Sequence, residues 1–426
     1  MKKKVALFFV LVFALSLFAT SALAAEVGGG TLRVWCWDPA FNLYAMEEAA
    51  KVYKQINPEF ELIIEEVPWD DLQMRLITIA NSNALDDLPD IFLCQNNAFQ
   101  KNMQNFPELF YDLTGSSIAF GEFPAGVLDF TIMDGKNYGV PFDNGTAINV
   151  IRTDVIAEAG YTIEDFTDIT WTQFIARAKH VLTHTGKPML SGVAGENDFI
   201  MVTLQSAGSS LFDDEGNPYI ADNAELKAAI KVYGDLVRAG VFVEYNGWNE
   251  FVGSFNSGSV AGVLSGCWIL GSVQVAEDQF GLWDITNLPR INGVEGATNY
   301  SAWGGSSWGV ASSSKNPELA IDFLSKTFAG SVEFYATILG SAGAIANWMP
   351  AADGPMYQQP QAFFNDEPIY ARIIEYGANV PSSNTGVYYY EARDAVGAAI
   401  QQILGGADMD AALREAEDAV NFAMGR

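Results

Sequence analysis

Cysteine and histidine are scarce in this sequence. Its 3 cysteines are too few to form a disulfide scaffold. Cys36 and Cys94 lie near the ends of expected strands, where a bridge would require neighbouring strands, and we favour free, buried thiols. The 2 histidines, His180 and His184, lie on one expected helix, and with no third ligand nearby they favour the surface. The sequence therefore predicts no metal and no cofactor.

Basic residues are also few. The chain carries 23 lysines and arginines against 52 aspartates and glutamates, a formal net charge of −29. Such a surface repels nucleic acid and anionic lipid, and it disfavours anionic ligands. No cluster of lysines and arginines offsets this charge, and neither H-E-x-x-H nor a phosphate-binding glycine loop is present. The composition favours a neutral or cationic small ligand, and no catalytic residue is predicted.

Long apolar runs are absent except near the start of the sequence. Lysines at positions 2–4 precede an apolar run over residues 5–19, and small residues follow up to Ala24. This order is typical of a secretory signal peptide over residues 1–24 that is cleaved after Ala24. No cysteine lies at that cut for lipid attachment, since the first is Cys36. The sequence predicts export to the periplasm or the extracellular space.

Strand and helix patterns alternate in the first part of the expected mature chain. Strand patterns cover residues 31–37, 60–67 and 90–94, and helical patterns cover residues 42–56 and 70–80. This β-α-β-α-β order predicts a parallel sheet with helices on both faces. Ligands of such sheets gather beyond the carboxyl ends of the strands, here at Trp37–Asp38 and Cys94–Asn97.

The remainder of the chain is long enough for a second domain. A strand pattern covers residues 146–152, and helical patterns cover residues 171–181, 224–239, 317–327, 390–404 and 409–424. The segment Phe255–Val273 is apolar but rich in glycine and serine, and Trp268 follows Ser265-Gly266-Cys267 directly. Either this is a core strand that narrows where it packs, or a strand ends there and presents its ring to a ligand.

Four stretches resemble motifs of the family-1 extracellular solute-binding proteins, the sugar-capturing components of ABC importers. They are Leu88–Phe92, Asp134–Phe142, Phe255–Trp268, and Gly304–Ala311 with the following Lys315–Phe323. The first resembles the family's P-D-I strand, and the second its G-K-x-Y-G-x-P passage. One departure is Gly262 after Ala261, where the family often has methionine. The order and spacing of the four stretches together carry the resemblance.

The resemblance implies an α/β fold of two lobes joined by hinge crossovers, each lobe a mostly parallel sheet flanked by helices. One lobe would hold residues 25–144 and 305–348, and the other residues 145–304 and 349–426. A ligand would bind in the cleft between them and the lobes would close over it. The implied partners are the permease subunits of an ABC importer in the membrane, and the protein would act as a monomer.

The family's contact positions give a set of candidate ligand-binding residues in this sequence. They are Trp37, Asp38, Asn96, Asn97, Asp143, Glu196, Asp198, Trp268, Trp303 and Tyr389. A sugar suits such a set because its C–H groups stack on an aromatic ring while carboxylates and amides bond pairs of hydroxyls. Trp171, Trp283, Trp308 and Trp348 are expected in core or hinge packing instead.

Two other functions remain open at this stage. The same fold can bind a polyamine or another cationic solute, but that needs several carboxylates along one slot, and Gln95, Asn96, Asn97 and Asn144 favour a neutral ligand. A secreted glycoside-active enzyme would need two carboxylates placed across a cleft. Such a pair cannot be recognised from sequence among so many acidic residues.

Overall fold

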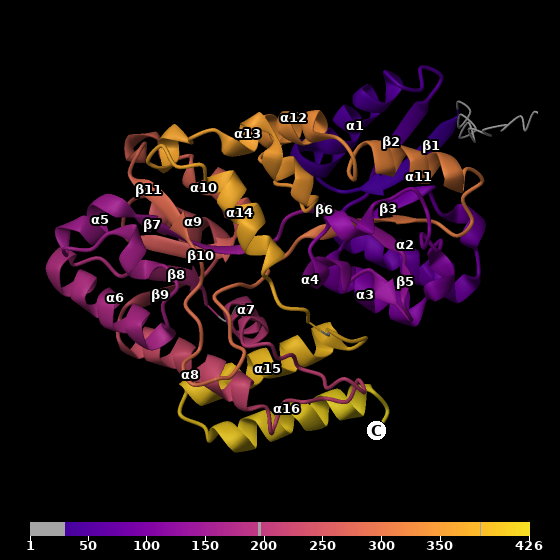
Figure 1. Cartoon of the computed structure of the whole chain (residues 1–426). Helices are drawn as coiled ribbons and strands as arrows, with labels where there is room; N and C mark the ends of the chain where they lie inside the picture. The colour runs from indigo at the N-terminus through magenta and orange to yellow at the C-terminus, as the bar shows by residue number, and fades with distance from the viewer. Residues whose placement is uncertain (1–29, 195–196, 384) are drawn as a thin grey trace, which may run out of the picture.

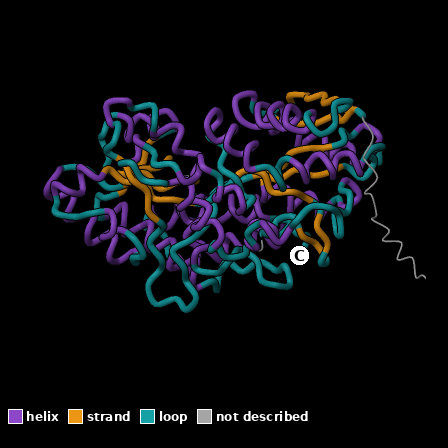
Figure 2. The backbone as a smooth tube through the Cα atoms, turned by 45° about the horizontal axis from the view of Figure 1, so that its top comes forward, coloured by secondary structure: helices purple, strands orange, loops and turns teal. Residues whose placement is uncertain are grey.

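The computed structural model describes residues 30–194, 197–383 and 385–426, and it shows two lobes with strands at the centre of each (Figures 1 and 2). The expected signal peptide, residues 1–24, lies outside the described residues. In the described ranges, no helix combines the length and the apolar character that a membrane span requires.

The first lobe is built around a five-stranded sheet in the order β2-β1-β3-β12-β6. Its strands are β1 (Thr31–Cys36), β2 (Glu61–Glu66), β3 (Ile91–Gln95), β6 (Gly139–Asp143) and β12 (Ser306–Val310). The strands β2, β1 and β3 are mutually parallel, as the alternation of strands and helices predicts. β12 runs antiparallel between β3 and β6, so the carboxyl ends of β1, β3 and β6 and the start of β12 share one edge.

Helices cover both faces of this sheet. They are α1 (Tyr44–Lys54), α2 (Trp69–Ser82), α3 (Asn96–Asn105), α11 (Pro317–Lys326) and α12 (Val332–Ala342). Tyr53 of α1 and Phe323 of α11 pack against Phe60, with ring centroids 4.8 and 5.1 Å from it. Residues distant in the sequence therefore share one core, and burying such rings is the main favourable term in folding.

The second lobe departs from the expected parallel arrangement. Its central sheet, in the order β10-β7-β11, is antiparallel, and only the separate pair of β8 (Leu190–Val193) and β9 (Phe242–Tyr245) is parallel. The central strands are β7 (Ala147–Arg152), β10 (Gly262–Gly266) and β11 (Trp283–Thr286). β7 carries the chain away from the first lobe, whereas β10 and β11 return it. A returning strand must run opposite to the outgoing one when the two are neighbours.

Helices also enclose the second sheet. They are α5 (Thr153–Glu158), α6 (Trp171–Thr185), α7 (Asp198–Ser206), α8 (Ala224–Arg238), α9 (Trp248–Asn256), α10 (Leu270–Val273), α15 (Tyr389–Leu404) and α16 (Met409–Ala423). α6 begins where a capping box predicts, because Thr170 and Gln173 satisfy each other's backbone N–H groups. The short α13 (Pro355–Gln358) and α14 (Ile369–Ala378) lie near the junction of the lobes (Figure 1).

Three chain segments meet where the lobes join, over residues 143–147, 301–306 and 343–347. The Asn144 N–H donates to the carbonyl of Ile345 at 2.8 Å, and the Trp303 N–H donates to the carbonyl of Gly145 at 2.6 Å. A Cβ on Gly145 would lie 2.4 Å from the carbonyl oxygen of Gly304, so the backbones of the first two segments are in direct contact at this point. These contacts define the hinge region.

Several expectations about buried residues are confirmed. Trp171, Trp283, Trp308 and Trp348 are all buried. The cysteines are free, and each lies in the interior. Burial raises the pKa of the Cys94 thiol to about 12 and raises that of Cys36 as well, so both stay protonated at neutral pH. His180 and His184 are exposed on α6.

Candidate functional site

A cleft of about 560 Å³ lies between the lobes, at the edge where the strands of the first sheet end. Eight of the ten candidate residues line it: Trp37, Asp38, Asn97, Asp143, Asp198, Trp268, Trp303 and Tyr389. A volume of this size is typical of a small-molecule site. The cleft therefore gathers residues that the sequence spreads over its whole length.

The other two candidates do not contribute to the described cleft. Asn96 is buried, its side-chain oxygen accepts a hydrogen bond from the hydroxyl of Ser307 at 2.9 Å, and its N–H donates to the carbonyl of Gly305. It joins α3 to the hinge region because the first residue of this helix turns inward from the strand end. Glu196 lies outside the described residues.

Trp37 and Asp38 form the first-lobe wall directly after β1. Both backbone N–H groups donate to the side-chain oxygen of the buried Asn42, each at 3.0 Å. These two bonds hold the turn that follows the strand. The ring of Trp37 meets that of Trp69 edge-on, with centroids 4.9 Å apart. The wall is thus fixed by contacts made without any ligand.

Trp268 lies on the second-lobe wall, two residues beyond the end of β10. Its side chain is 36% exposed, and its Nε1 donates to the carbonyl oxygen of Trp303 at 2.9 Å. A Cβ on Gly266 would lie 2.2 Å from that nitrogen, so only glycine lets the indole fold back over the strand end. The small residues before Trp268 therefore set the position of its ring, which lines the cleft.

Asp143 is a buried carboxylate at the hinge end of β6. The hydroxyl of Ser306 donates to it, and it is 7% exposed. Burial raises the pKa of Asp143 to about 6, although hydrogen bonds from Ser306 and from the backbone act in the opposite direction. This carboxyl consequently changes charge close to physiological pH.

Side chains from the start of α15 also line the cleft, namely those of Tyr389, Tyr390 and Arg393. Tyr389 and Asn97 line the cleft from opposite lobes, and burial raises the pKa of the Tyr389 hydroxyl above its usual range. Asp198 pairs with Arg393 at 3.5 Å. The guanidinium of Arg393 also lies 5.4 Å from the ring centroid of Tyr390. The ion pair thereby neutralises one of the cleft's acidic groups.

Some lining residues were not anticipated. They include Phe41, Phe130, Met201, Gln205, Ser209, Thr385, Tyr390 and Arg393. Gln205 bonds both the hydroxyl of Ser301 and the N–H of Ala302, so it supports the hinge region from α7. A polar residue on the apolar face of a helical pattern over residues 198–206 is the signal that would have revealed it. Arg393 lies one helical turn after Tyr389 and follows from placing α15 correctly.

One serine has the spacing of a hydrolase nucleophile, in the G-x-S-x-G run Gly305–Gly309. Ser307 is its central residue, but it lies fully buried within β12 and its hydroxyl donates to Asn96. A nucleophile elbow needs the serine on a sharp turn between strand and helix, exposed to substrate. Ser307 is therefore a structural residue.

Comparisons with known proteins agree with this architecture. A family model described as bacterial extracellular solute-binding protein matches residues 48–365. The lactose-binding protein of Rhizobium radiobacter is 36% identical over 402 residues, which cover 94% of each chain. The solved structure of the sugar-binding protein MalE from Xanthomonas citri has a TM-score of 0.79 at 19% identity, over 93% of this chain and 98% of that chain.

A second solved structure is the galacto-N-biose/lacto-N-biose I-binding protein of Bifidobacterium longum, with a TM-score of 0.73 at 18% identity, over 93% of this chain and 97% of that chain. At these identities the solved structures support the two-lobed fold alone. The family model and the relative from Rhizobium radiobacter also identify the family, because each match covers most of the sequence. The chain belongs to the bacterial extracellular solute-binding proteins, a family of binding proteins and not of enzymes.

Proposed function

We propose that this protein captures a sugar or oligosaccharide in the cleft between its lobes and delivers it to an ABC importer. The observation that supports this proposal is the partly exposed indole of Trp268, which lines the same cleft as Asp38, Asn97 and Asp143. Sugars need this combination of an apolar plane and hydroxyl partners. The lactose-binding relative and the sugar-binding structural neighbours support the same ligand class.

The charge of the cleft supports a neutral ligand over a polyamine or other cation. Among the residues that the structure describes, three carboxylates line it, from Asp38, Asp143 and Asp198. Asp198 is paired with Arg393, and the carboxylate of Asp143 already accepts a hydrogen bond from the hydroxyl of Ser306. A dication would need unpaired, ionised carboxylates along one slot.

Capture would proceed by hinge closure. The ligand docks on one wall and the lobes, which we assign to residues 25–144 with 305–348 and to residues 145–304 with 349–426, close by rotation about the three hinge segments. The closed form is then recognised by the permease subunits in the membrane. We further propose that the protein acts as a monomer and is exported with cleavage after Ala24.

A calorimetric titration tests the ligand class. The mature protein is titrated with galactose, with lactose and its galactosyl trisaccharide, and with maltose and maltotriose. Spermidine is titrated as the cationic alternative. We expect at least one sugar to bind with a Kd below about 100 µM, and spermidine not to bind, since a closing cleft buries several hydrogen bonds at once. Binding of spermidine without any sugar would contradict the proposal.

Contacts from α3 hold the lobes together across the cleft and give a second prediction. Lys101 pairs with Glu391 of α15 at 3.3 Å, and Gln100 accepts from the N–H of Thr385 at 3.1 Å. We expect Lys101→Ala to raise the sugar's dissociation rate two- to fivefold with little effect on folding, because an exposed pair contributes up to about 1 kcal/mol. Stopped-flow fluorescence measures this rate.

The matched control is Lys51→Ala, which removes a lysine paired with Glu48 inside one helix of the first lobe. It deletes the same charge without crossing the cleft, so the dissociation rate should stay at the wild-type value. An equal effect of both variants would mean that net charge, and not the contact across the cleft, sets the rate.

A further inference from the structure

Two tryptophans of this chain are well exposed, and they lie side by side. Trp268 is 36% and Trp248 is 45% exposed, and their ring centroids are 5.8 Å apart. Single exposed apolar residues are ordinary on protein surfaces, but adjacent large rings in water mark an interaction site. Because Trp268 lines the cleft, Trp248 extends the aromatic surface of the cleft outward.

The surface around Trp248 is continuous with the cleft. Trp268 and Trp303 line the cleft, and together with Trp248 they also line a small hollow of about 20 Å³ beside it. Trp248 is the first residue of α9, just after the carboxyl end of β9. Trp268 and Trp303 therefore connect the cleft with the hollow that Trp248 lines.

Polar side chains surround the ring of Trp248. Asn246, Asn249 and Glu250 are all exposed beside it. One oxygen of the Glu250 carboxylate accepts from the N–H of Asn246 at 3.1 Å, which fixes this side chain at the start of α9. Amides and a carboxylate around an indole reproduce the chemistry of the cleft itself, namely an apolar plane with hydroxyl partners at its edge.

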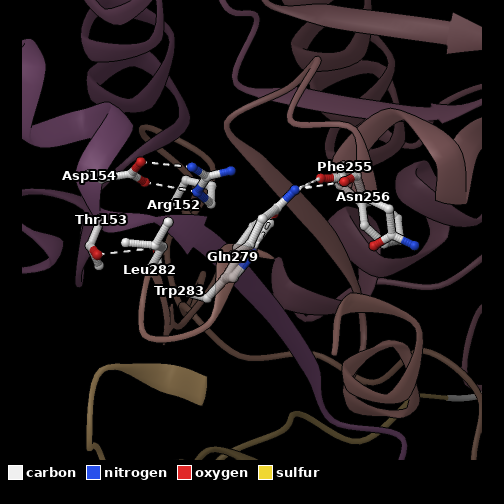
Figure 3. Close-up of polar contacts among 8 residues, drawn as sticks. All are labelled: Arg152, Thr153, Asp154, Phe255, Asn256, Gln279, Leu282 and Trp283. Atoms are coloured by element: carbon white, nitrogen blue, oxygen red, sulfur yellow. Dashed lines mark hydrogen bonds and ion pairs between the residues drawn. The ribbon is translucent and has the colours of Figure 1, made fainter. Parts of the chain in front are cut away.

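The helix that carries Trp248 is anchored at its other end (Figure 3). The buried amide of Gln279 donates to the carbonyls of Phe255 and Asn256, at 3.2 and 2.7 Å. Its oxygen accepts from the Nε1 of the buried Trp283 at 3.0 Å. α9 is thus fixed to the second lobe, and a ligand that contacts Trp248 does not have to order it first.

We propose that Trp248 forms an outer subsite for an additional sugar unit of an oligosaccharide whose inner units occupy the cleft against Trp268. This inference rests on the proposed function and refines it. The outer subsite selects for chain length, because a longer saccharide reaches Trp248 and a shorter one held within the cleft does not. The ligand class is therefore an oligosaccharide that leaves the closed cleft at one end.

The test compares affinities for saccharides of different length in wild type and Trp248→Ala. Calorimetry is performed with lactose and its galactosyl trisaccharide, and with maltose, maltotriose and maltotetraose. In wild type the longer member of the bound series should bind more tightly. In Trp248→Ala we expect this preference to shrink three- to tenfold while the disaccharide Kd is unchanged, and Trp248→Phe to restore most of it.

Phe422→Ala is the matched control, since it removes an exposed ring, 84% accessible, from α16 and should leave all affinities unchanged. An unchanged length preference in Trp248→Ala overturns the outer subsite, and so does an equal loss for both lengths, which would mean that Trp248 only supports Trp268. If no sugar binds the wild-type protein, the proposed function itself fails, and the subsite fails with it. A preserved disaccharide Kd shows that the variant is folded.

Discussion

Trp268→Ala is expected to weaken binding of the best sugar at least about thirtyfold, which corresponds to about 2 kcal/mol. The indole offers a preformed plane, held by its bond to the carbonyl of Trp303, and alanine leaves the sugar's C–H face against water. Calorimetry gives the affinity directly and avoids the loss of fluorescence signal. The melting temperature should change little, because the ring is only partly buried.

Gly266→Ala provides an independent check on this assignment. The added methyl group would meet the indole nitrogen of Trp268 at 2.2 Å and the carbonyl oxygen of Trp303 at 2.4 Å, so the ring must move although it is still present. We expect a loss of affinity comparable to that of Trp268→Ala. Wild-type affinity in both variants would place the sugar elsewhere and refute the proposed cleft wall.

Asp143→Asn is expected to lower sugar affinity at pH 7 about tenfold and to abolish its dependence on pH. An ionised carboxylate accepts a stronger hydrogen bond from a hydroxyl than an amide does. With a pKa of about 6, only about a tenth of the wild-type protein carries this charge at pH 5, so its Kd should rise about tenfold between pH 7.5 and 5. Cys267 and Tyr335, the neighbouring titratable groups, have pKa values raised by burial and stay neutral over this range.

The same carboxyl links stability to pH in a defined direction. Its folded-state pKa lies above the unfolded value of about 3.9, so the folded protein binds the proton more tightly. Ionisation therefore reduces the free energy of unfolding as pH rises from about 4 to about 6, by roughly 3 kcal/mol at most. Above that window the loss is constant.

Denaturant titrations of wild type and Asp143→Asn between pH 4 and 7 measure this effect. The variant should lack the part of the pH slope that this carboxyl contributes, while other carboxyls act equally on both proteins. If the two proteins show parallel slopes and equal pH dependence of sugar binding, Asp143 is not the titrating group in the cleft.

Regular periodicity made the first lobe predictable from sequence. The strand and helix patterns over residues 31–94 reappear as β1, α1, β2, α2 and β3 with ends shifted by a few residues, because each element is fixed by its own apolar spacing. For the stretch before Trp268 the sequence left two interpretations open, and the structure shows that β10 ends at Gly266, where only glycine leaves room for the indole. Local rules are sufficient where local contacts decide the structure.

Features that depend on contacts between distant segments could not be predicted from the sequence. The antiparallel order of β10, β7 and β11 follows from the chain's return to the first lobe, which no short pattern encodes. Asn96 and Asn97 are adjacent and alike, yet only the register of α3 directs Asn97 to the cleft and Asn96 to Ser307. The pairing of Asp198 with Arg393 likewise needs the position of α15 against α7.

The place of β12 in the first sheet has a consequence for how the chain acquires its structure. This strand lies between β3 and β6, but it is synthesised after all the strands of the second lobe. Until it arrives, β3 and β6 have no partner on their facing edges, and pairing so distant in sequence is slow. A nascent chain of this topology therefore cannot complete the sheet of its first lobe until synthesis has passed Val310, after every strand of the second lobe.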